Sequence, residues 1–125
     1  MKPIKILAVD DDAAILDYYR ALLTKAGYQV ETAAEATGAI ILFKEAPADL
    51  IVLDVVMPSG GGKQVLDVVS GIIQKGVPIV FVTGLPEKII PWLSGQTNIS
   101  VMKKPVKSEE LLSVIAGLLP KGGQV

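Results

Sequence analysis

Five short runs of apolar residues alternate with longer segments in which apolar residues recur every three or four positions. The short runs cover residues 4–9, 28–32, 50–53, 79–82 and 99–102, and the run at 28–32 is the weakest. Isoleucine, valine, leucine and phenylalanine dominate these runs, with little polar alternation. This pattern is typical of strands that are covered on both faces, and it predicts a parallel sheet.

The segments between the predicted strands have helical periodicity. Residues 13–26 carry one apolar stripe, and Gly27 supplies a stop signal directly after it. A second stripe precedes Pro47, and a third, within 65–73, precedes Gly76. We therefore expect a helix after each of the first three strands.

The last two helical segments differ from each other. The segment between the fourth and fifth strands contains four residues that interrupt helices: Gly84, Pro86, Pro91 and Gly95. We expect a short or irregular helix there. The final segment has an apolar stripe: Leu111, Leu112, Ile115, Leu118 and Leu119. Ser108 is expected to cap this helix, with Glu109 and Glu110 at its positive end.

Alternating strands and helices predict an α/β fold, a three-layer doubly wound parallel sheet with right-handed crossovers. The 125 residues suit a single domain at 1–125, with a structured core at about 3–119 and no output domain after it. Half of the residues are hydrophobic, which excludes disorder for most of the chain. Such a sheet places its functional site at the carboxyl ends of its strands.

The composition removes several classes of chemistry. The chain has no cysteine and no histidine, which excludes disulfides, thiolate and imidazole metal sites, cysteine nucleophiles and histidine bases. A net charge of −1 argues against direct binding to nucleic acid. No uncharged run is long enough to insert into a membrane. We expect a cytoplasmic protein whose chemistry uses carboxylates, hydroxyls and lysine.

Polar residues follow four of the predicted strands. The first strand is followed by three aspartates, the third by one, the fourth by a threonine and the fifth by a lysine: Asp10, Asp11, Asp12, Asp54, Thr83 and Lys104. The second strand offers only Thr32. Because parallel strands end at one edge of the sheet, these side chains should converge. Carboxylates without histidine or cysteine suit Mg²⁺ or another hard cation, which would also relieve their mutual repulsion.

This constellation suits phosphoryl transfer to a carboxylate. An ionised Asp54 can act as an oxygen nucleophile. The incoming phosphoryl oxygens need neutralisation, which a bound cation and the Lys104 ammonium could supply together. The Thr83 hydroxyl could donate a hydrogen bond to a phosphoryl oxygen.

The motifs resemble those of a response-regulator receiver domain, the phosphoacceptor module of two-component signalling. The matching segments are 9–12, 49–58 with Gly62, 78–84 and 103–105, and the resemblance extends over essentially the whole chain. It implies a flavodoxin-like sheet in the order 2-1-3-4-5 and a signalling module that is not an enzyme beyond its own phosphoryl transfer and autodephosphorylation. It also implies a sensor histidine kinase or another phosphohistidine-bearing donor. Since this chain has no histidine, that donor lies in another protein or domain.

The resemblance assigns the acidic residues. Asp54 would be the phosphoacceptor, and Asp10 and Asp11 would bind Mg²⁺ together with Asp54. The backbone carbonyl of Val56 would be a further Mg²⁺ ligand. The loop at 57–62 is richer in glycine than is usual in the family, and we expect it to be mobile without metal.

The resemblance also assigns the switch. Thr83 would be its hydroxyl residue, Lys104 would pair with the phosphoryl group, and the Lys104–Pro105 bond would be cis. The family usually has an aromatic residue three positions before the lysine, where this chain has Val101. The usual coupling of the hydroxyl to a swinging ring therefore cannot operate here in that form.

Three alternatives compete with this reading. The pair Asp10 and Asp12 echoes haloacid-dehalogenase-like phosphatases, but Ala14 departs from their motif and Asp54 would have no role. A flavodoxin-like FMN carrier is disfavoured because three aspartates would repel its phosphate. A receiver-fold docking module that is never phosphorylated is kept open by Val101.

Two further residue groups have ordinary structural interpretations. Asp12 is expected to cap the first helix, because aspartate is a favoured N-cap residue. Tyr18 and Tyr19 are interpreted as packing residues rather than as a binding platform.

Overall fold

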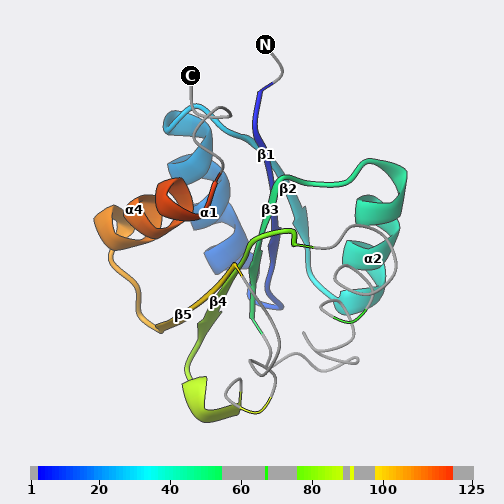
Figure 1. Cartoon of the computed structure of the whole chain (residues 1–125). Helices are drawn as coiled ribbons and strands as arrows, with labels where there is room; N and C mark the ends of the chain where they lie inside the picture. Colours follow the sequence, from blue (N-terminus) through cyan, green and yellow to red (C-terminus); the bar gives the residue numbers. More distant parts are fainter. Residues whose placement is uncertain (1–2, 55–66, 68–75, 89–90, 92–97, 120–125) are drawn as a thin grey trace.

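A five-stranded parallel sheet forms the centre of the computed structural model, which describes residues 3–54, 67, 76–88, 91 and 98–119 (Figure 1). The strands are β1 (Lys5–Val9), β2 (Gln29–Ala33), β3 (Leu50–Leu53), β4 (Ile79–Thr83) and β5 (Ile99–Lys103). Their order is β2-β1-β3-β4-β5, and every pairing is parallel. The predicted α/β fold and strand order are confirmed.

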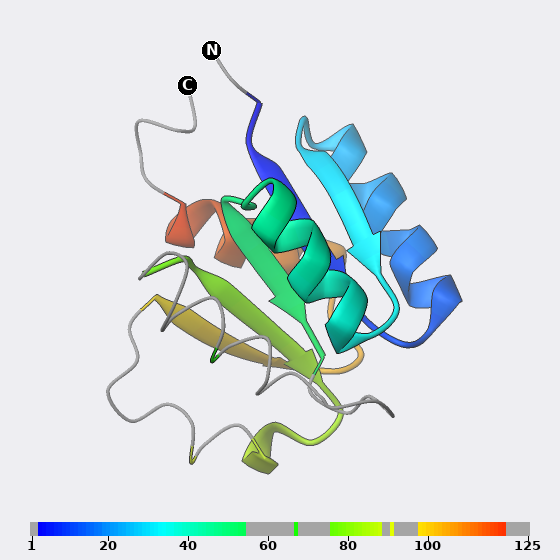
Figure 2. The ribbon, with the colours of Figure 1, turned by 90° about the vertical axis from the view of Figure 1, so that its right-hand side faces the viewer.

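Helices cover both faces of this sheet. Helices α1 (Ala13–Lys25) and α4 (Ser108–Leu118) lie on one face, and α2 (Ala36–Glu45) lies on the other (Figure 1). Figure 2 shows α2 crossing in front of the strands, on the side opposite α1 and α4. The three-layer arrangement expected from the sequence is therefore present in the described residues.

Alternation along the strands builds two apolar cores. In β1, Ile6 and Ala8 pack with residues of α1 and α4, while Leu7 and Val9 pack with residues of α2. Successive side chains of a strand point to opposite faces, so one uninterrupted apolar run supplies both cores. This is the physical reason why the strand sequences lack polar alternation.

Helix α1 begins and ends as its sequence predicts. The Asp12 carboxylate accepts hydrogen bonds from the backbone N–H groups of Ala14 (2.9 Å) and Ile15 (3.4 Å), so the predicted N-cap is confirmed. Gly27 follows the helix with φ = +101°, a conformation that favours glycine and lets the chain turn into β2.

Helix α4 begins one residue earlier than expected. Ser108 is the first helical residue, and the N-cap is Lys107, which makes no side-chain capping bond. The prediction that Ser108 caps this helix was therefore wrong. The Lys107 carbonyl accepts the first helical bond, from the Leu111 N–H (3.0 Å). This start accompanies complete burial of Leu111, and Glu109 and Glu110 lie in the first turn as expected.

The predicted third and fourth helices fall largely outside the described residues. Of the stripe at 65–73, only Asp67 is described, and it is helical. After β4, the described residues include the 3₁₀ turn η2 (Pro86–Lys88), which agrees with the irregularity expected there. The loop at 57–62 and Val56 also lie outside the described residues.

None of the described helices combines the length and the apolar character that crossing a membrane requires.

Candidate functional site

Three of the predicted site residues are held by extensions of the sheet. The backbone N–H of Asp10 donates to the last carbonyl of β2 (3.2 Å), that of Asp54 to the last carbonyl of β1 (3.0 Å), and that of Lys104 to the last carbonyl of β4 (2.8 Å). Each residue directly follows a strand and continues its hydrogen-bond ladder. The sheet itself therefore fixes these three residues at one edge.

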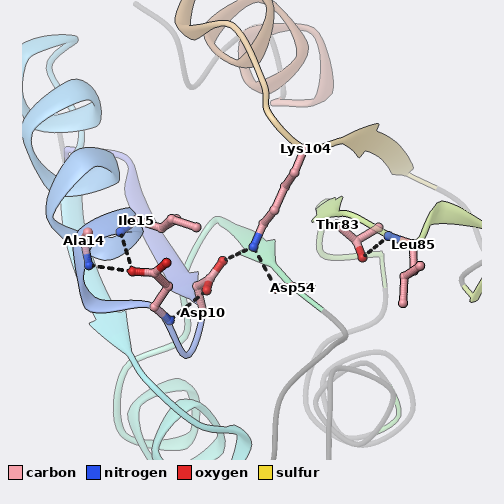
Figure 3. A network of polar contacts seen from close by, with 8 residues as sticks. Asp10, Ala14, Ile15, Asp54, Thr83, Leu85 and Lys104 are labelled. Atoms are coloured by element: carbon pink, nitrogen blue, oxygen red, sulfur yellow. Dashed lines mark hydrogen bonds and ion pairs between the residues drawn. The ribbon is translucent and has the colours of Figure 1, made fainter.

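Lys104 bridges two buried carboxylates. Its Nζ donates to Oδ2 of Asp10 (2.8 Å) and to Oδ2 of Asp54 (2.9 Å), as Figure 3 shows. Asp10 is 1% exposed and Asp54 is 5% exposed. Burial of two carboxylates is costly unless charge and hydrogen bonds compensate it, and one ammonium group compensates only part of their charge.

The electrostatics of the cluster follow from this imbalance. Burial raises the pKa of Asp10, because the ionised carboxylate loses water there, although the Lys104 hydrogen bond acts in the opposite direction. Burial by itself would lower the pKa of Lys104, but its bonds to Asp10 and Asp54 outweigh that effect and raise it. Lys104 therefore stays an ammonium ion at neutral pH, while Asp10 is harder to ionise than a free aspartate.

The three consecutive aspartates have three different environments. Asp10 points into the cluster, where its Oδ1 accepts a hydrogen bond from the Asp12 N–H (2.9 Å) and its Oδ2 accepts from Lys104. Asp12 caps α1 through its own carboxylate. Asp11 is exposed. Thus the bond from the Asp12 backbone orients Asp10, and Asp11 remains accessible to an ion from solvent.

Asp10, Asp11 and Asp54 can present one carboxylate oxygen each within 4.8 Å of one another. Such oxygen ligands fit a hard divalent cation, which would compensate the negative charge that the Lys104 ammonium does not neutralise. The predicted acidic group is therefore assembled in the described residues, with Asp11 open to solvent.

Thr83 reaches the same edge but bonds locally. It is fully buried, and its hydroxyl accepts a hydrogen bond from the Leu85 N–H (3.0 Å), apart from the Lys104 network (Figure 3). A threonine at the end of a strand often forms a local hydrogen bond of this kind. Val101 lies opposite Phe81 in the β4–β5 pairing and is half-buried. The Lys104–Pro105 peptide bond is cis, as the resemblance implied.

Comparisons with known proteins agree with this geometry. The sequence model of the response regulator receiver domain matches residues 6–116. The protein named "Probable transcriptional regulator ycf27" of Porphyra purpurea is 34% identical over 124 residues, which cover 97% of this chain and 49% of that protein. The transcriptional regulatory protein TrcR of Mycobacterium tuberculosis is 29% identical over 98% of this chain and 48% of its own. The chain thus spans about half the length of these relatives.

Solved structures share this fold over most of the chain. The chemotaxis protein CheY4 of Vibrio cholerae superimposes with a TM-score of 0.85 at 33% identity, over 94% of this chain and all of that one. A CheY-like receiver domain from Methanospirillum hungatei gives a TM-score of 0.82 at 29% identity, over 93% of both chains. The family match, these neighbours and the assembled acidic edge agree: the chain belongs to the response-regulator receiver domains, the phosphoacceptor modules of two-component signalling.

Proposed function

We propose that Asp54 accepts a phosphoryl group from a phosphohistidine of a histidine kinase or related donor, and that Asp10, Asp11 and Asp54 bind the Mg²⁺ that this transfer needs. The observation that carries the proposal is the contact of the Lys104 ammonium with Asp54 at 2.9 Å, inside the acidic group. This contact holds a carboxylate and a charge-compensating ammonium group side by side at the carboxyl edge of the sheet, which supports Asp54 as the nucleophile.

The proposed transfer is a single displacement at phosphorus. An oxygen of Asp54 forms a bond to phosphorus as the phosphorus–nitrogen bond of the donor breaks, and the bonding electrons leave with the imidazole nitrogen, which is protonated from solvent. The Lys104 ammonium can donate hydrogen bonds to the phosphoryl oxygens. A bound Mg²⁺ would supply further charge compensation to those oxygens and to the carboxylates.

Thr83 and Lys104 support the proposal in different ways. A hydroxyl has one donor and two acceptor sites, so Thr83 can donate to a phosphoryl oxygen while it still accepts from the Leu85 N–H. Lys104 stays a protonated hydrogen-bond donor both before and after Asp54 accepts the phosphoryl group. With Val101 in place of an aromatic residue, we expect phosphorylation to switch a protein–protein interaction surface through Thr83, without a swinging ring.

The phosphatase alternative loses support from the same contacts. It needs Asp10 as nucleophile and Asp12 as its acid. Both oxygens of Asp10 already accept hydrogen bonds, and the Asp12 carboxylate is committed to the start of α1.

Intact-mass measurement after incubation with acetyl phosphate and Mg²⁺ tests the proposal. We expect a mass increase of one phosphoryl group in the wild type, and none in Asp54→Asn or after chelation of Mg²⁺. Asp17→Asn is the matched control, since Asp17 is an exposed aspartate of α1 outside the cluster, and it should keep the adduct.

Two outcomes would contradict the proposal. An adduct that persists in Asp54→Asn would place the phosphoryl group on another residue. No adduct on the wild type, under conditions that label a known receiver domain, would favour the docking module that is never phosphorylated.

A further inference from the structure

A pocket of about 390 Å³ lies beside the acidic cluster, between α1 and the chain that follows β5. Its walls are formed by three residues of α1, one residue of β4 and three residues after β5: Ile15, Tyr18, Tyr19, Val82, Lys104, Pro105 and Val106. Figure 3 shows Ile15 extending from α1 on the side where the Lys104 side chain descends toward Asp54. Ligand pockets of proteins begin at volumes of roughly 300 Å³, so this pocket has room for a small molecule.

The pocket is mainly apolar. Besides the hydroxyl of the exposed Tyr18, two polar side-chain groups line it, and the first is the Tyr19 hydroxyl. Tyr19 is only 2% exposed, and it makes no hydrogen bond with any residue that the structure describes. Among those residues, no fully buried polar side-chain atom lacks a partner, so the hydroxyl must reach solvent. Since Tyr19 lines the pocket, we infer that its hydroxyl reaches solvent there. A buried tyrosine normally finds a partner for this group.

The second polar group is the Lys104 ammonium. An ammonium carries three N–H donors, of which Asp10 and Asp54 accept two. The third has no acceptor among the described residues, and Lys104 lines the pocket. The pocket therefore offers two donors, from Tyr19 and Lys104, for which a ligand can provide the acceptor.

The carboxylates of Asp10 and Asp54, which contact Lys104, limit the chemical nature of that acceptor. Two carboxylates face one ammonium, so an anion entering the pocket would meet net negative charge from Asp10 and Asp54. The same surroundings raise the pKa of Tyr19, first through burial and then through the charge of Asp10, so its hydroxyl stays a donor. A neutral oxygen suits these donors better than a carboxylate or a phosphate.

The apolar walls favour an aromatic body. The rings of Tyr18 and Tyr19 lie 5.9 Å apart at 49°, and Tyr18 is 42% exposed at the rim. Tilted rings at this separation leave edges and faces on which a third ring can pack. Ile15 and Val106 supply aliphatic contacts on the other walls.

We propose that this pocket binds a small neutral aromatic molecule with a hydrogen-bond-accepting oxygen directed at the Tyr19 hydroxyl and the free N–H of Lys104. The packing role predicted for the two tyrosines would then be incomplete, because Tyr19 packs in the core and also presents its hydroxyl to a ligand. The site does not depend on phosphoryl transfer at Asp54, since it is complete in the unmodified chain.

Three probes with the same ring test the proposal by amide NMR titration of the unmodified, Mg²⁺-free protein. Benzamide carries a neutral acceptor, benzoate an anionic one and toluene none. We expect benzamide to shift the amide signals of Tyr19, Val82 and Val106 saturably, with a Kd on the order of 1–10 mM. Benzoate and toluene should each bind at least about fivefold more weakly.

Matched variants separate the hydroxyl from the packing. Tyr19→Phe keeps the ring and should weaken benzamide about fivefold while leaving toluene unchanged. Tyr18→Ala, at the exposed rim, should weaken benzamide and toluene alike. Ile41→Ala is the control, since Ile41 is 52% exposed on α2 and lies on the opposite face of the sheet.

Several results would overturn the proposal. These are the absence of saturable shifts at these signals with benzamide, binding of benzoate as tight as that of benzamide, and binding of benzamide by Tyr19→Phe as tight as by the wild type. Equal weakening of benzamide and toluene in Tyr19→Phe would mean that the variant disturbs packing and that the hydroxyl does not bind the ligand.

Discussion

The body of the sheet and its carboxyl edge are made by the same strands but differ in what they bury. In the body, the residues at 6–9, 50–53 and 79–82 are all apolar and at most 1% exposed. One residue past β1 and β3 stand Asp10 and Asp54, which are almost as buried, at 1% and 5%, but carry carboxylates. The change from apolar to acidic takes a single step along the chain.

This difference separates stability from function in the fold. Apolar burial in the body favours folding with no partner needed, whereas each buried carboxylate at the edge has to be compensated. For Asp10, the described contacts that compensate the charge are hydrogen bonds from the Lys104 ammonium and from the Asp12 backbone N–H. The edge is therefore the part of the molecule that an ion or a phosphoryl group can stabilise further.

The largest expected effect tests the body. Phe81→Ala removes a fully buried ring from the middle of β4 and should lower the free energy of unfolding by about 3–5 kcal/mol, through lost burial and a cavity. Urea denaturation measures this loss. Leu85→Ala, just beyond the strand and 38% exposed, is the control and should change stability by no more than about 0.5 kcal/mol. If Phe81→Ala lowers the free energy of unfolding as little as the control does, the distinction between the body of the sheet and its edge is wrong.

The next effect tests the compensation at the edge. Lys104→Met leaves Asp10 and Asp54 without their shared cation, and stability should fall by about 1–3 kcal/mol in metal-free buffer. Mg²⁺ at tenfold its Kd should stabilise the wild type by about 1.4 kcal/mol. The stabilisation should be larger in the variant, because the lysine no longer competes for the carboxylates.

Thermal unfolding with and without Mg²⁺ measures both quantities. Lys103→Met, at the exposed neighbouring position, is the matched control and should behave like the wild type. Equal stability of the Lys103 and Lys104 variants, or no response of the wild type to Mg²⁺, would mean that the acidic edge is not under electrostatic strain.

A smaller effect should raise the free energy of unfolding instead of lowering it. Asp10→Asn should stabilise the metal-free protein by about 1 kcal/mol, because the raised pKa of Asp10 shows that its charged form is disfavoured where it is buried. Asparagine still offers an oxygen to the Asp12 N–H. The variant should also lose most of its response to Mg²⁺. If it unfolds at a lower urea concentration than the wild type, the Lys104 hydrogen bond outweighs the cost of burial.

An effect of about the same size, but destabilising, concerns Asp12, an exposed residue of the same edge. Asp12→Ala removes the two hydrogen bonds that cap α1 and should cost about 1 kcal/mol in urea denaturation. Lys107→Ala, at the start of α4, removes no side-chain cap and should leave stability within about 0.5 kcal/mol. Similar losses in both variants would contradict the assignment of the Asp12 cap.

Local pattern explains which features were predictable. Unbroken apolar runs predicted the strands because both faces of the sheet are covered, and the strand order came with the family resemblance. The residue after each strand predicted the acidic edge, since parallel strands end together. The cap at Asp12 was also readable, but the expected cap at Ser108 was wrong by one residue, because small shifts of a helix start leave little trace in composition.

The sequence alone determined the layers of the fold, the edge that carries the chemistry and the residue types available there. Only the tertiary structure decided how these groups pair. It placed Lys104 between Asp10 and Asp54, paired the Thr83 hydroxyl with the Leu85 N–H and put Tyr19 in the wall of a pocket. Periodicity reports which side of an element is buried, whereas these pairings join residues as far as 94 positions apart and depend on side-chain directions that packing sets.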